Sequence, residues 1–155
     1  MAKHLWLLRH GEAVPHGSRP DAVRELTPKG ERQSKLAGEA LARAGLELAA
    51  AYSSPKIRAR DTARIVCEEL GVNFEEASLL TAGFDRRDAE ELLIAHDDDE
   101  HVLVVGHEPD FSQVVYDLTG ARIDLKKGGV AAVKLGREPE LVVLLRPAEL
   151  EPMAG

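Results

Sequence analysis

Cysteine and long apolar runs are both scarce in this 155-residue chain. The single cysteine, Cys67, excludes an intrachain disulfide and agrees with a reducing, cytoplasmic setting. The N-terminal apolar stretch is interrupted by Arg9 within a few residues, and no segment is long enough to span a bilayer. The composition therefore predicts a globular cytoplasmic protein with no membrane association.

An excess of positive charge is also absent. The chain has 20 Lys and Arg residues against 27 Asp and Glu residues, which gives a formal net charge of −7 at pH 7. This balance disfavours nonspecific binding to nucleic acids and to anionic membrane surfaces. It does not exclude an anionic substrate, because arginines gathered in a cleft can oppose the overall charge locally.

Strands and helices are expected to alternate along the sequence. Apolar runs bounded by turn residues predict five strands, over 5–8, 46–52, 102–105, 130–135 and 141–145. Capping residues, prolines and terminal glycines predict four helices, over 28–44, 55–70, about 86–96 and 109–119. The expected N-caps of the first three helices are Thr27, Ser54 and Asp85.

This alternation predicts a single three-layer α/β/α domain over residues 1–155. Its central sheet is expected to be mostly parallel, with the last two strands forming a C-terminal pair. A chain of this length can bury a substantial core. Residues 149–155 are expected to form a frayed tail. The oligomeric state is left open by the sequence.

The first strand ends in Arg9-His10-Gly11-Glu12. In an open α/β sheet, ligands bind at the carboxyl ends of the strands, so this is where a substrate is expected. Gly11 allows the backbone to turn sharply and leaves room beside the histidine. The pairing suggests a nucleophilic imidazole next to a phosphate-binding guanidinium.

Two more residues are placed to meet this pair. His107 follows the strand over 102–105, and Arg58 lies in the first turn of a helix, where the helix dipole favours anions. If the two strands are neighbours, both histidines and both arginines can reach one pocket. Two guanidiniums there can grip a phosphoryl group and neutralise the charge that develops during its transfer.

Together these segments resemble the histidine phosphatase (phosphoglycerate mutase-like) superfamily. The short length, the segment over 26–30 and the absence of a cap insertion resemble its small SixA-type phosphohistidine phosphatases. The resemblance extends from residue 5 to about residue 145. The matching motifs, in chain order, are Leu8-Arg9-His10-Gly11-Glu12, Ser53-Ser54-Pro55 with Arg58 and Thr62-Ala63, and Val105-Gly106-His107.

The resemblance implies a role for each residue. His10 matches the nucleophile that becomes phosphorylated, Arg9 and Arg58 match phosphate-binding arginines, and His107 matches a second histidine that binds phosphoryl oxygens. Water then hydrolyses the intermediate, and no metal or other cofactor is implied. The implied substrate is phosphohistidine on a protein, such as a phosphorelay domain. A small-molecule phosphomonoesterase of the same mechanism is the alternative.

One feature of larger superfamily members has no clear counterpart here. Those enzymes take an acidic residue from the middle of the chain to protonate the leaving oxygen. Asp85 and Asp88 are candidates for this acid, although both suit helix capping better. A site without an acid suits phosphoramidates and activated esters, because a departing imidazole can be protonated on its other nitrogen.

Other residues admit more than one role. His16, in the loop after the nucleophile, is a candidate substrate-binding residue at the pocket rim, and Glu12 either orients the turn or hydrogen-bonds Arg58. The acidic run over 96–101 fits a solvated connector better than a metal site. A phosphate-recognising regulatory module without catalysis is a further alternative, but binding alone would not need a nucleophile.

Overall fold

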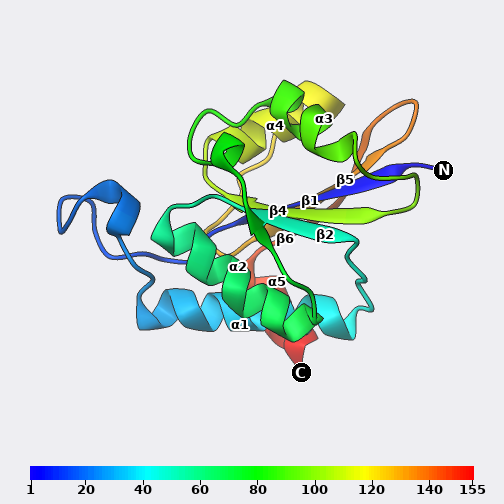
Figure 1. Cartoon of the computed structure of the whole chain (residues 1–155). Helices are drawn as coiled ribbons and strands as arrows, with labels where there is room; N and C mark the ends of the chain where they lie inside the picture. The colour runs from blue at the N-terminus through cyan, green and yellow to red at the C-terminus, as the bar shows by residue number, and fades with distance from the viewer.

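Six strands form one central sheet in the order β3-β2-β4-β1-β5-β6 (Figure 1). The computed structural model describes all residues, 1–155. The four strands from β3 to β1 pair in parallel, whereas β5 is antiparallel to both of its neighbours. The predicted sheet, mostly parallel with a C-terminal strand pair, is therefore confirmed. The strands are β1 Lys3–Arg9, β2 Ala50–Ser53, β3 Glu75–Glu76, β4 His101–Gly106, β5 Val130–Leu135 and β6 Glu140–Leu145.

Helices cover both faces of the sheet, which confirms the predicted three layers. Figure 1 shows α1, α2 and α5 on one face and α3 and α4 on the other. Each face has its own apolar core: alternation along β1 places Leu5 and Leu7 in one core and Leu8 in the other. The helices are α1 Pro28–Arg43, α2 Ile57–Leu70, α3 Arg86–Leu93, α4 Asp110–Thr119 and α5 Pro147–Ala154, with 3-10 helices η1 Asp21–Val23 and η2 Ser78–Leu80.

Local capping sets where two of the helices begin. The Thr27 hydroxyl accepts a hydrogen bond from the Gly30 amide at 3.1 Å, as predicted for the N-cap of α1. Asp85 and Asp88 form a reciprocal capping box at the start of α3. That helix ends at Leu93, about one turn earlier than the sequence predicts.

The expectation of a frayed C-terminal tail is wrong. Residues from Pro147 onward form α5, and the Leu150 side chain is fully buried in the core that α1 and α2 share with the sheet. Small residues of α1, including Ala37 and Ala40, belong to the same core and leave room for it. Burial of one apolar side chain against a distant helix is not visible as a local pattern, so the sequence did not reveal it.

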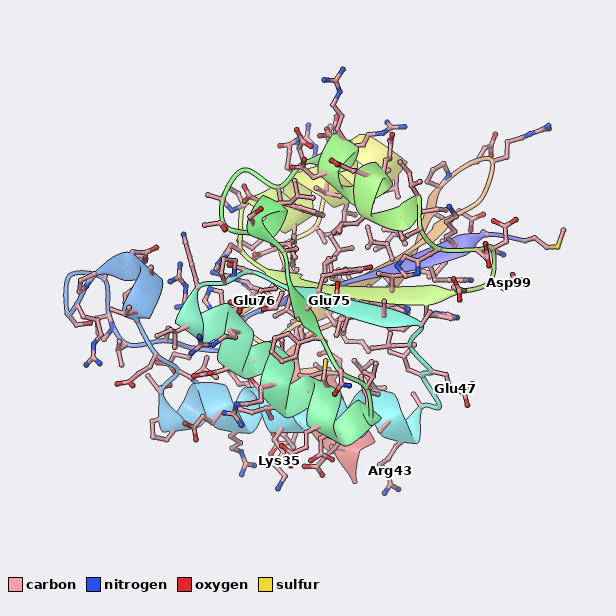
Figure 2. The ribbon with its side chains drawn as sticks, in the orientation of Figure 1. Lys35, Arg43, Glu47, Glu75, Glu76 and Asp99 are labelled. Atoms are coloured by element: carbon pink, nitrogen blue, oxygen red, sulfur yellow. The ribbon has the colours of Figure 1, made fainter.

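Charged side chains cover the outer surface of the molecule (Figure 2). Lys35 and Arg43 are exposed on α1, and both residues of the edge strand β3, Glu75 and Glu76, are exposed as well. Charge on an edge strand disfavours pairing with another sheet. None of the helices combines the length and apolar character that a membrane crossing requires.

The register between β1 and β4 positions the two candidate histidines. The strands are parallel, and Arg9 lies opposite Gly106. His10 and His107 therefore follow the ends of two adjacent strands, at the same edge of the sheet. The sequence left the adjacency of these strands as a condition for the pocket, and the structure meets that condition. The site depends on this feature of the fold.

Candidate active site

A pocket of about 180 Å³ opens at the carboxyl ends of β1 and β4. Arg9, His10, Arg58 and His107 all line it, so the structure brings the four predicted residues together. His10, Arg58 and His107 are each more than nine-tenths buried. A larger hollow, of about 540 Å³, lies along α1 and α2, but it is lined mainly by charged surface side chains and contains none of these residues.

The backbone after His10 is held against the first turn of α1. A Cβ atom on Gly11 would come within 2.5 Å of the Gly30 carbonyl oxygen, so glycine is required for this approach. The Gly11 amide donates a hydrogen bond to Thr62 Oγ1 at 3.1 Å, which ties the same turn to α2. The nucleophile candidate is therefore anchored by two helices as well as by its own strand.

The His10 ring is held as a neutral imidazole with one free nitrogen. Its Nδ1 lies 2.7 Å from the Gly11 carbonyl oxygen, and because a carbonyl only accepts, Nδ1 carries the proton. Burial lowers the pKa of His10 from 6.5 to about 3, and the positive charges of Arg58 and Arg9 act in the same direction. The ring is thus uncharged near neutral pH, with its lone pair on Nε2.

His107 packs beside His10, with the ring centroids 5.3 Å apart, and is oriented by Ser54. The Ser54 hydroxyl lies 2.8 Å from His107 Nε2 and also accepts a hydrogen bond from the Lys56 amide at 3.2 Å. Ser54 is therefore not the N-cap of α2; the helix begins at Ile57, later than predicted, with Lys56 as its N-cap. If Ser54 donates its own proton to Nε2, His107 carries its proton on Nδ1.

Three buried side-chain nitrogens of the pocket residues have no hydrogen-bond partner in the protein. They are Arg9 Nε, Arg58 Nε and His107 Nδ1. The other guanidinium nitrogens are partly engaged: Arg9 Nη1 donates to the Leu125 carbonyl at 3.0 Å, and Arg58 Nη1 to the Asp21 carbonyl at 2.8 Å. Buried polar groups without partners are rare, and all three belong to residues that line the pocket.

The structure also places residues in the site that the sequence reasoning missed. Arg24 lines the pocket, is buried, and donates to the Val14 carbonyl at 2.8 Å. Lys127 lines it from the segment before β5. Both lie in irregular segments whose paths depend on long-range contacts, so no periodicity or motif marked them.

The structure also shows the surroundings of His16 and Glu12, the two loop residues to which the sequence analysis gave possible roles. His16 lines the pocket at its rim, with a largely exposed side chain. The suggested hydrogen bond from Arg58 to Glu12 does not form, since Asp21 is the acceptor instead. Glu12 contributes its backbone, which bonds to Gln33 and Thr27 and so orients the turn after His10.

The pocket is lined by no carboxyl group that is free of hydrogen bonds within the protein. Asp85 and Asp88 are engaged in the capping box of α3 and do not line the pocket. Glu108 is the one acidic residue in the lining, and its carboxylate accepts hydrogen bonds from the backbone amide and the hydroxyl of Ser112. The arrangement therefore supplies cationic and neutral donors to a substrate, but no evident acid for the leaving group.

Acidification is expected to destabilise the protein through its two pocket histidines. Burial lowers the pKa of His10 to about 3 and that of His107 to about 4, both from 6.5, so the unfolded chain binds protons in this window that the folded chain does not. As the pH falls below 6.5, each histidine removes up to about 1.4 kcal/mol of unfolding free energy per pH unit.

Urea unfolding at about pH 7 and about pH 5 measures this loss. The double variant His10→Ala, His107→Ala should lose clearly less stability on acidification than the natural chain. An equal loss in both proteins would show that the two rings are not held neutral by burial.

Comparison with known proteins agrees with this geometry. Residues 5–81 match the model of the histidine phosphatase superfamily (branch 1). An uncharacterized protein from Picosynechococcus sp. is 29% identical over 170 residues, covering 96% of this chain and 99% of its own length. The mitochondrial serine/threonine-protein phosphatase Pgam5 of Drosophila pseudoobscura pseudoobscura is 33% identical over 88 residues, which cover 57% of this chain and only 29% of that protein.

Among solved structures, the protein histidine phosphatase SixA complexed with tungstate superposes with a TM-score of 0.85. The two chains are 26% identical, and the match covers 95% of this chain and 99% of the other. The similarity thus extends over nearly the whole domain, beyond the segment that the family model matches.

Proposed function

Because the chain belongs to the histidine phosphatase superfamily, we propose that it hydrolyses phosphohistidine on a protein through a phosphohistidine intermediate of its own on His10. The observation that carries the proposal is the state of the His10 ring. Its proton is committed to the Gly11 carbonyl, its pKa lies far below neutrality, and its free nitrogen belongs to a ring that lines a cationic pocket. These are the properties that a nitrogen nucleophile needs.

The first half of the reaction is a transfer of the phosphoryl group. His10 Nε2 attacks phosphorus, a P–N bond forms, and the bond from phosphorus to the leaving group breaks. Arg9, Arg58 and His107 line the pocket and donate N–H groups to the phosphoryl oxygens. Donors fixed in advance stabilise the charge that develops on these oxygens.

Hydrolysis of the intermediate completes the cycle. Water attacks the phosphorus of phosphorylated His10, the P–N bond breaks, and the electron pair returns to Nε2. Inorganic phosphate leaves with the oxygen and the protons supplied by water. The ring is then neutral again, as its lowered pKa requires.

The size and the lining of the site favour a substrate with an activated leaving group. A pocket of about 180 Å³ accommodates a phosphoryl group and leaves most of a substrate outside, as suits a group presented by another protein. Its lining has no carboxyl group free to donate a proton, because Glu108 is occupied by Ser112. An imidazole leaving group can be protonated by solvent on its distal nitrogen before the bond to phosphorus breaks, whereas an alkoxide leaving group has no second basic atom. The similarity to a protein histidine phosphatase points the same way.

A substrate panel tests the proposal. We expect kcat/KM for a phosphohistidine peptide, and to a lesser degree for an aryl phosphate, to exceed that for a hexose phosphate by about 100-fold or more. Comparable turnover of the hexose phosphate would instead favour a small-molecule phosphomonoesterase. Phosphate binding without hydrolysis of any compound would favour a regulatory module.

A further inference from the structure

One carboxylate beside the pocket, that of Asp21, contacts three cationic side chains. Its Oδ2 lies 3.1 Å from Lys56 Nζ and accepts a hydrogen bond from Arg58 Nη2 at 3.3 Å, while Oδ1 accepts from Arg24 Nε at 3.1 Å. Its main-chain carbonyl accepts from Arg58 Nη1 at 2.8 Å. A single residue therefore holds both terminal nitrogens of the Arg58 guanidinium.

Asp21 lies at the far end of the loop that joins β1 to α1. The base of this loop is closed by a bridge between Ala13 and Leu26 and by a hydrogen bond from the Val14 amide to the Glu25 carbonyl at 2.9 Å. Beyond that base, Asp21 opens η1, which packs against α2 (Figure 1). The Asp21 contacts thus fasten the loop to the helix that carries Arg58.

Asp21 is the counterion of the three cationic side chains around it. Arg24 and Arg58 are both buried, and they lie close together. Burial lowers the pKa of Arg58, and the charge of Arg24 lowers it further. The negative charge of Asp21 opposes both effects. Hydrogen bonds from Lys56 and Arg24 hold the pKa of Asp21 well below its usual range, so its carboxylate is charged at neutral pH. The side chain of Asp21 is about half exposed, in contrast to its arginine partners.

We propose that Asp21 is a positioning residue for the phosphatase reaction. It fixes the Arg58 guanidinium, with Arg24 beside it, in the orientation that grips the transferred phosphoryl group, and it does not touch the substrate itself. This inference rests on the proposed function. A carboxylate near a phosphate site does not assist anion binding by its charge, so its contribution is orientation, which matters most in the transition state.

The variant Asp21→Asn distinguishes an effect on the orientation of Arg58 from an effect of the Asp21 charge on phosphate binding. We expect its kcat on a chromogenic aryl phosphate to fall about 10- to 100-fold, while inhibition by inorganic phosphate stays as strong or becomes stronger. Asp21→Glu, which keeps the charge, should recover part of the lost kcat. The matched control is Asp61→Asn on α2, which removes the same charge next to Arg60 and should retain the natural kcat.

A double variant tests the coupling directly. Lysine cannot be held at two nitrogens, so adding Asp21→Asn to Arg58→Lys should lower kcat less than about threefold further. Thermal unfolding confirms that each variant is folded.

Three results would overturn the positioning role. They are an unchanged kcat in Asp21→Asn, a fall in kcat matched by equally weakened phosphate inhibition, and full additivity with Arg58→Lys. Each of these would leave an active natural enzyme, and so the proposed function, intact. A natural chain inactive on every phosphorylated compound would overturn the proposed function, and this inference with it.

Discussion

Replacing His10 by alanine is expected to abolish turnover, lowering kcat on an aryl phosphate by roughly 10⁴- to 10⁶-fold. The reason is that the neutral His10 ring supplies the attacking nitrogen, and its position against the turn at Gly11 cannot be taken over by His107, which is held by Ser54. Steady-state hydrolysis of the aryl phosphate measures the effect.

The matched control is His4→Ala. His4 lies on β1, near the end opposite to the one that His10 follows, and stacks on His101 outside the pocket. This variant should keep its activity if it remains folded, which circular dichroism checks. Hydrolysis that survives His10→Ala at more than about one-hundredth of the natural rate would contradict nucleophilic catalysis by His10.

Arg58→Ala is expected to lower kcat by about 10²- to 10³-fold, the cost of removing one preorganised donor from a developing oxyanion. The side chain is buried, has an unpartnered Nε, and is held in orientation by Asp21. Arg58→Lys should restore only part of the loss, because an ammonium cannot form bidentate hydrogen bonds.

Arg64→Ala provides the comparison for Arg58→Ala on the same helix. Arg64 is an exposed residue of α2, and its removal should leave kcat within about twofold. Equal losses in the two variants, measured on the same aryl phosphate, would mean that the effect of Arg58 is not specific to the pocket.

The parts of the fold that follow from local chemistry could be predicted. Thr27 before Pro28, and Asp85 with Asp88, carry their capping function within one helical turn, so the start of each helix is visible in the sequence. By contrast, α5 depends on Leu150 reaching a core built by α1 and the sheet. The adjacency of β1 and β4, which the sequence left as a condition, and the register between them likewise came only from the structure.

The residues of the site also divide into those that the sequence could predict and those that it could not. His10, Arg9, Arg58 and His107 stand at strand ends or in a helix's first turn, and such positions meet at one edge of the sheet. Arg24 and Asp21 lie in the irregular loop between β1 and α1, whose path is set by contacts with α2. Ser54 was identified as a cap because its role toward His107 needs a neighbour 53 positions away.

The central claim is that the phosphoryl group passes through His10, and trapping the intermediate tests it most directly. A substrate labelled in its phosphoryl group is mixed with the enzyme and the reaction is quenched in a denaturant at alkaline pH. The account predicts label on the His10 peptide that survives base, is lost in acid and is absent from His10→Ala. Label that resists acid, or that persists in His10→Ala, would contradict it.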